Sequence, residues 1–144
     1  MEEKLKDLLL KDLSARLPYG VKVKENYHTE VCVLRGIDLV HKTIVMEGRA
    51  TIFNGISIFS GNGKAKVKPY LRPMSSMTEE EKKEMHEKLS PTGTAIYKEE
   101  GISTPLNHYS NWIPYEYMSR IIDWLNAHHF DYRGLIPMGL AKIP

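Results

Sequence analysis

The sequence predicts an α+β fold with an N-terminal helix, an antiparallel β meander or small open barrel, and two C-terminal helices. Three observations lead to this prediction. Leucines recur about every four residues through the first 17 positions, which is typical of a single apolar helix face. Short apolar and polar alternations separated by Gly and Asn turns fill residues 20–72. Two later stretches carry helix-start signals.

The first predicted helix covers residues 1–17. Its apolar face consists of Leu5, Leu8, Leu9, Leu13 and Leu17. Pro18 and Gly20 end it, because proline and glycine both interrupt helices. An isolated helix of this length is only marginally stable in water, so its leucine face needs a sheet or a second helix to cover it.

The β region covers residues 20–72. Strands are expected at 21–24, 30–34, 43–47 and 64–70. The pair Asn54-Gly55 predicts a type I′ turn, because both central residues of that turn need positive φ. We therefore expect the flanking sequences ATIF and ISIFS to form a hairpin. Gly61-Asn62-Gly63 predicts a second turn.

The sheet should stop at Pro69 and Pro73, and a helix should follow over residues 78–89. Thr78 and Glu81 have the spacing of a capping box, in which each side chain binds the other residue's backbone N–H.

Residues 90–112 are rich in Ser, Pro, Thr, Gly and Asn and predict a long loop with room for one short strand at 94–98. The last helix and a tail occupy 113–144, with the helix starting near Pro114.

The composition limits the class of protein. A length of 144 residues predicts a single domain. The formal charge of +2 is small, although residues 1–77 hold 13 Lys and Arg against 8 Asp and Glu.

The one cysteine, Cys32, lies between two valines and suits a buried position in a reducing compartment. No signal peptide and no apolar run near the roughly 20 residues of a membrane span are present, so a soluble cytoplasmic protein is expected.

No pattern of catalytic residues, phosphate loop or metalloprotease helix is present in the sequence. The histidines do not have the regular short spacing of a zinc site, even if His128 or His129 is combined with His108 and Asp131. The sequence therefore predicts no catalytic set, no cofactor and no metal ion.

The basic stretch that ends the β region is the best candidate for binding a partner. Lys64, Lys66 and Lys68 point to one face of a regular strand, and Tyr70 and Arg72 continue the same parity. Such a face suits a phosphate backbone and a stacked base. Lysines on an outer strand also protect a sheet edge against aggregation, and the sequence leaves both interpretations open.

Aromatic residues gather in the last third of the chain. Tyr109 and Trp112 lie in the predicted loop and are candidates for binding a protein partner or a second copy of the chain, because Tyr and Trp are enriched at interaction hot spots. Trp124 lies on the apolar face of the last predicted helix, which indicates a core position.

Three segments resemble a known family. They are LSARLPYGVKV at 13–23, VKPYLRPMSSMTEEEKKEM at 67–85 and DWLNAHHFDYRGLIPMGLA at 123–141. The chain resembles a family of small proteins from gut Bacteroidales genomes and their phages, for which no activity is established. The resemblance implies phage or mobile-element ancestry and a shared packing scheme.

The leading expectation is a non-enzymatic accessory or binding protein. The alternative is a nucleic-acid-binding protein that uses the basic stretch 64–72, and an enzyme of unknown type comes third. We also expect PYLRP at 69–73 to lie against HFDYRGL at 129–135, with Arg72 and Asp131 as an ion pair.

Overall fold

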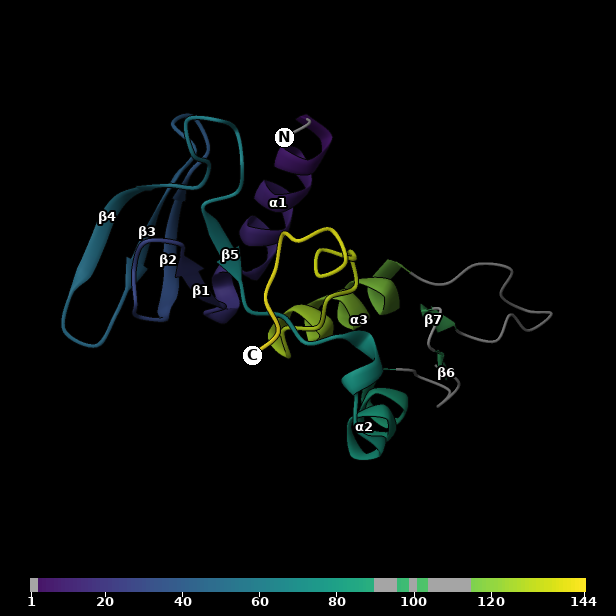
Figure 1. Ribbon diagram of the computed structural model, residues 1–144. Helices are drawn as coiled ribbons and strands as arrows, with labels where there is room; N and C mark the ends of the chain where they lie inside the picture. The colour runs from purple at the N-terminus through teal and green to yellow at the C-terminus, as the bar shows by residue number, and fades with distance from the viewer. Residues whose placement is uncertain (1–2, 90–95, 99–100, 104–114) are drawn as a thin grey trace. The chain divides into compact units, whose positions relative to one another are not determined.

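The computed structural model describes residues 3–89, 96–98, 101–103 and 115–144, with side chains described within 3–85 and 118–144. The chain forms two compact units. The sheet unit comprises Met1–Leu71 and Arg133–Pro144, and the helical unit comprises Arg72–Tyr132. The predicted α+β class, with an N-terminal helix, an antiparallel sheet and two later helices, is confirmed (Figure 1).

The sheet unit begins with helix α1 (Glu3–Arg16), which a short 3₁₀ helix (Leu17–Tyr19) extends. Leu9 and Leu13 of α1 are fully buried, which confirms the predicted leucine face. Gly20 ends the helical segment at φ 62° and donates its N–H to the carbonyl of Leu17 at 3.3 Å. A left-handed residue at this position is a common helix stop, and glycine adopts it without strain.

The sheet has five antiparallel strands in the spatial order β4-β3-β2-β1-β5. They are β1 (Lys22–Glu25), β2 (Cys32–Asp38), β3 (Thr43–Glu47), β4 (Ile52–Ser57) and β5 (Val67–Pro69). The first four strands therefore form a meander, and β5 returns to pair with β1. Figure 1 shows α1 beside β1 and β5, so the leucine face of the helix and the sheet bury one another.

The predicted hairpin at Asn54-Gly55 is wrong, because both residues lie inside the single strand β4. The pairing of β4 with β3 shifts there: Ile44 faces Ile56 and Met46 faces Phe53, which leaves one extra residue on β4. Gly55 has φ 65°. A bulge with glycine at positive φ needs the same backbone conformation as a type I′ turn. The Asn54-Gly55 pair therefore correctly indicates a residue at positive φ, but that residue lies in a bulge and not in a hairpin turn.

The C-terminal segment completes the sheet unit. Lys142 donates its N–H to the carbonyl of Pro69 at 2.8 Å, and Leu71 donates its N–H to the carbonyl of Lys142 at 2.8 Å. Pro69 has no N–H to offer a neighbouring strand, yet its carbonyl is satisfied by this contact. Leu135 and Leu140 are buried in the same core as α1, so residues far apart in sequence share one apolar core.

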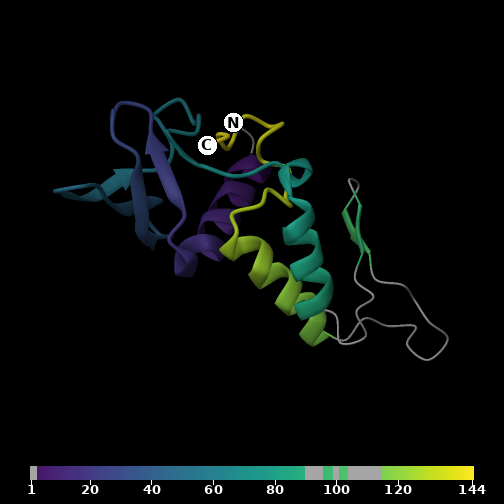
Figure 2. The same ribbon diagram turned by 90° about the horizontal axis from the view of Figure 1, so that it is seen from below.

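The helical unit contains a 3₁₀ helix (Met74–Ser76), α2 (Glu79–Leu89), the strand pair β6 (Ile96–Lys98) and β7 (Gly101–Ser103), and α3 (Tyr115–Ala127). Helices α2 and α3 lie side by side, in teal and yellow-green in Figure 2. The predicted capping box is confirmed: Glu81 donates its N–H to Thr78 Oγ1 at 3.1 Å, and Thr78 donates its N–H to Glu81 Oε1 at 3.0 Å. Trp124 is buried, as predicted.

The expected contact between the PYLRP and HFDYRGL segments is present in the helical unit at Arg72. This residue forms a parallel bridge with Phe130, donates its N–H to His129 at 2.8 Å and accepts the N–H of Asp131 at 2.8 Å. The expected side-chain pair with Asp131 is wrong, because the Arg72 guanidinium binds Glu81 instead. Glu81 lies in the capped first turn of α2, where the capping box holds its carboxylate toward Arg72.

Candidate functional site

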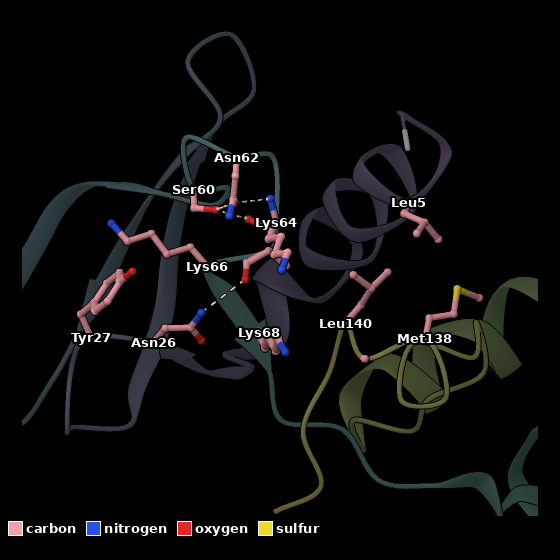
Figure 3. A pocket seen from close by; sticks show the side chains of 12 residues that line it. Leu5, Asn26, Tyr27, Ser60, Asn62, Lys64, Lys66, Lys68, Met138 and Leu140 are labelled. Carbon is pink, nitrogen blue, oxygen red and sulfur yellow. Dashed lines mark hydrogen bonds between the residues drawn. The ribbon is translucent and has the colours of Figure 1, made fainter. Parts of the chain in front are cut away.

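Three lysines of the predicted basic stretch line one pocket of about 410 Å³ in the sheet unit. We call it the lysine pocket. Its wall consists of Leu5, Asn26, Tyr27, Ser60, Asn62, Lys64, Ala65, Lys66, Lys68, Met138, Gly139 and Leu140. Figure 3 shows Lys64 and Lys68 in the middle, Asn26 and Tyr27 on one side with Lys66 extending toward Tyr27, and Leu5, Met138 and Leu140 on the other side. The pocket therefore has a polar, aromatic side and an apolar side.

Strand pairing explains how the lysines reach the same pocket. Lys66 and Lys68 are two residues apart, so they point to the same face of the sheet. Lys24 of β1 lies directly opposite Lys68, and Asn26 donates its N–H to the carbonyl of Lys66 at 2.9 Å. Like charges directly opposite one another destabilise a strand pair. A bound anion on this face would therefore reduce the electrostatic repulsion between Lys24 and Lys68.

The lysine amines differ in their partners. Lys66 Nζ lies 3.7 Å from Glu25 Oε1 and 5.4 Å from the centre of the Tyr27 ring. Within the described part of the chain, the amines of Lys64 and Lys68 have no acceptor and no ion-pair partner. Lys64 is exposed, and Lys66 and Lys68 are half-buried. Two cations thus remain available to a ligand, and a third is only partly neutralised.

Glu25 is the buried counter-charge beside the pocket, with 2% of its surface exposed. Its Oε2 accepts the backbone N–H of Tyr27 at 3.2 Å and lies 3.5 Å from His28 Nε2. Lys24 donates to the backbone carbonyls of Glu25 and His28. These bonds fix the turn that follows β1, and with it the position of Tyr27 at the rim of the pocket.

The remaining residues of the predicted basic face lie elsewhere. Tyr70 donates its N–H to the carbonyl of Lys22 at 2.8 Å, so it follows Lys68 along the sheet but does not line the pocket. Arg72 belongs to the helical unit. Its guanidinium binds Glu81 and lies 4.2 Å from the centre of the Phe130 ring, which gives it a packing role there.

The predicted partner-binding aromatics Tyr109 and Trp112 lie outside the described residues, as does most of the predicted loop 90–112. The predicted strand at 94–98 is described only at β6 (Ile96–Lys98), which pairs with β7 (Gly101–Ser103).

Sequence reasoning missed Tyr27, which is the aromatic residue of the lysine pocket. Its side chain is 81% exposed. The sequence does hold one indication of this role: Tyr27 is a large aromatic residue among the polar residues Asn26, His28 and Thr29, and it is not part of an apolar repeat that would explain it as a core residue. The short distance between Tyr27 and Lys66 could not be predicted from the sequence, because the two residues are about 40 positions apart and only the strand register of the folded chain brings them together.

Neither a metal centre nor a membrane span is found in the described part of the chain. Within it, no three or more His, Cys, Asp or Glu side chains are grouped closely enough to hold a metal ion. None of its helices combines the length and the apolar character that crossing a bilayer requires. No protein-family model matches the chain, and comparisons with curated proteins and with solved structures give no significant match.

Proposed function

We propose that the protein is a non-enzymatic binding protein and that the lysine pocket takes a phosphate-bearing anion. One observation carries the proposal: Lys64, Lys66 and Lys68 line a single pocket, and the counter-charge beside them is the buried Glu25 at 3.7 Å from Lys66. An accessory binding role also agrees with the resemblance to small Bacteroidales and phage proteins.

Edge protection by lysine is the competing explanation, and the structure weakens it. Edge lysines protect a strand whose N–H and C=O groups are open to another chain. The outer side of β5 is instead occupied by its own chain, because Val67 donates its N–H to Ile58 at 3.2 Å and Pro69 accepts from Lys142 at 2.8 Å. The lysines are therefore not needed to protect this edge.

Binding of inorganic tripolyphosphate tests the proposal, with thermal unfolding and calorimetry as the measurements. A ligand that binds only the folded state stabilises it by about 2.7 kcal/mol at a hundred times Kd. We expect tripolyphosphate to raise the Tm of the wild-type protein and to have little effect on a variant with Lys64, Lys66 and Lys68 replaced by Gln.

A second triple variant, with Lys11, Lys42 and Arg49 replaced by Gln, removes the same charge from positions outside the pocket and should respond like wild type. Equal responses of the two triple variants would show that only net charge matters and would contradict the proposal. No response of the wild-type protein at low salt would also contradict it.

A further inference from the structure

We infer that the phosphate-bearing ligand is a single-stranded nucleic acid with one base stacked on Tyr27. This inference rests on the proposed anion-binding function and names the class of ligand. It depends on Tyr27, on the linear order of the lysines and on the mixed lining of the pocket, each of which is a property of the sheet unit.

Tyr27 has the geometry of a stacking platform. Its side chain is 81% exposed although it lines the pocket. Its backbone is held by the bond from its N–H to Glu25 Oε2 at 3.2 Å, and Lys66 Nζ lies 5.4 Å from its ring centre. An exposed ring on a fixed backbone can accept any base, because every base has a π face.

The lysines follow a line rather than a cluster. Lys64, Lys66 and Lys68 alternate with the buried Ala65 and Val67. Only Lys68 lies in β5, but the backbone before it is also extended, because Ala65 forms a bridge with Phe59 and Lys66 accepts the N–H of Asn26. At about 3.3 Å per residue of extended backbone, neighbouring lysines are about 6.6 Å apart along the chain. Successive phosphates of an extended strand can meet successive lysines at such a spacing. A compact anion would contact only one or two of these amines, so it would not account for three lysines in a line.

The rest of the pocket suits an unpaired nucleotide. Leu5, Met138 and Leu140 provide an apolar side opposite Tyr27 (Figure 3), and Asn26 and Asn62 bring side-chain amides. Bases in a duplex are stacked and paired, so they present no free face to an aromatic ring. Single strands expose such faces, and proteins bind them by combining basic grooves with aromatic side chains. The pocket therefore favours a single strand over a duplex.

The test compares three ligands: a labelled oligothymidylate, a labelled duplex and tripolyphosphate. The wild-type protein should bind the single strand more tightly than the duplex. For three phosphate contacts, log K should fall with log salt at a slope of about −2. Replacing Lys64, Lys66 and Lys68 by Gln should remove most of this slope.

Tyr27→Ala separates the inference from the proposed function. It should weaken oligothymidylate binding by about tenfold or more, as expected for loss of one base stack, while the salt slope and tripolyphosphate binding stay unchanged. Tyr27→Phe should bind within about twofold of wild type, because stacking needs only the ring. Val40→Ala shortens another highly exposed side chain, outside the pocket, and should have no effect.

The outcomes are distinct. If tripolyphosphate binds but Tyr27→Ala leaves oligothymidylate affinity unchanged, the inference is overturned and the anion site stands. Equal affinity for duplex and single strand overturns it as well. If neither tripolyphosphate nor oligothymidylate binds, both the inference and the proposed function are overturned.

Discussion

Arg72 and Glu81 form a two-point ion pair in the helical unit, with Nη1 and Nη2 each 2.7 Å from a carboxylate oxygen. Glu81 also accepts the N–H of Thr78 at 3.0 Å, so a single carboxylate caps α2 and holds the preceding segment. Bidentate Arg–carboxylate pairs are among the stronger polar contacts in proteins. These bonds, with that from Arg72 as the largest cause, lower the pKa of Glu81 from its ordinary 4.5 to about 2.

We predict that this pair makes the stability of the helical unit depend on pH in the acid range. Since the folded state holds the Glu81 pKa at about 2 against an ordinary 4.5, the unfolded state binds more protons between these values. The contribution is complete above about pH 4.5 and is lost as pH falls toward 2. Glu81→Gln should cost roughly 1.5–3 kcal/mol at neutral pH and should flatten the stability profile in this window.

Urea unfolding at several pH values, followed by amide signals of α2 and α3, provides the measurement. Glu80→Gln is a matched control, because Glu80 is an exposed residue in the same helix turn and should leave the profile intact. An acid profile of Glu81→Gln that follows wild type would show that Arg72 does not set this dependence.

A second prediction concerns the bulge in β4. Gly55 has φ 65°, and a Cβ there would meet no atom within 4 Å, so any cost of a larger residue comes from the backbone. Gly55→Val should lower the free energy of unfolding by roughly 1–2 kcal/mol or more, although valine normally favours strands. Gly61→Val is the control, because Gly61 also has open space but no positive φ. Equal stability of the two variants, measured by urea unfolding, would refute the explanation.

Local sequence signals predicted those elements that local forces determine. The leucine face of α1, the strand Thr43–Glu47 and the Thr78–Glu81 capping box all depend on residues within a few positions of one another. Asn54-Gly55 gave the right backbone preference but the wrong element, since a bulge and a hairpin turn both use positive φ.

The contacts between segments far apart in the sequence could not be predicted, because they depend on long-range pairing. The return of the C-terminal segment to Pro69 through Lys142, and the meeting of Tyr27 with Lys66, depend on strand register and on a shared core. Neither leaves a periodic pattern in the sequence. The alternation of the three lysines with buried residues was predictable from the sequence, but the predicted strand 64–70 is too long, because β5 covers only Val67–Pro69. Tyr27 lies in the turn after β1, and its position beside Lys66 was not predictable.

A third prediction concerns Cys32, which is 1% exposed in the core, as the flanking valines suggested. Its thiol pKa is raised, first by burial and then by the charge of Glu30, against an opposing effect of Lys24. Because the thiolate is the reactive form, the native protein should react with iodoacetamide far more slowly than the protein unfolded in urea. The chain has one cysteine, so mass spectrometry reads the labelled fraction directly, and rapid labelling of the native protein would contradict the buried position.

The last prediction concerns the charged cluster that ties the C-terminal segment to α1. Asp12 accepts from Arg16 Nε at 2.9 Å and from Arg133 Nη1 at 3.0 Å. The side chains of Asp12 and Arg16 are fully buried, and that of Arg133 is 19% exposed. Removing one partner of a buried ion pair leaves an uncompensated charge and costs about 3–5 kcal/mol.

Asp12→Ala should therefore destabilise the sheet unit by about that amount, and Arg133→Gln should cost less, roughly 1–2 kcal/mol, because Arg133 keeps access to water. Asp7→Ala removes an exposed carboxylate from the same helix and should change stability by less than about 0.5 kcal/mol. Replacing Asp12 by Ala and Arg16 by Met together should recover much of the loss, since an apolar pair needs no counter-charge. If Asp12→Ala were as mild as Asp7→Ala in urea unfolding, the cluster would not be what holds residues 133–144 against α1, and the shared apolar core around Leu135 and Leu140 would have to do so alone.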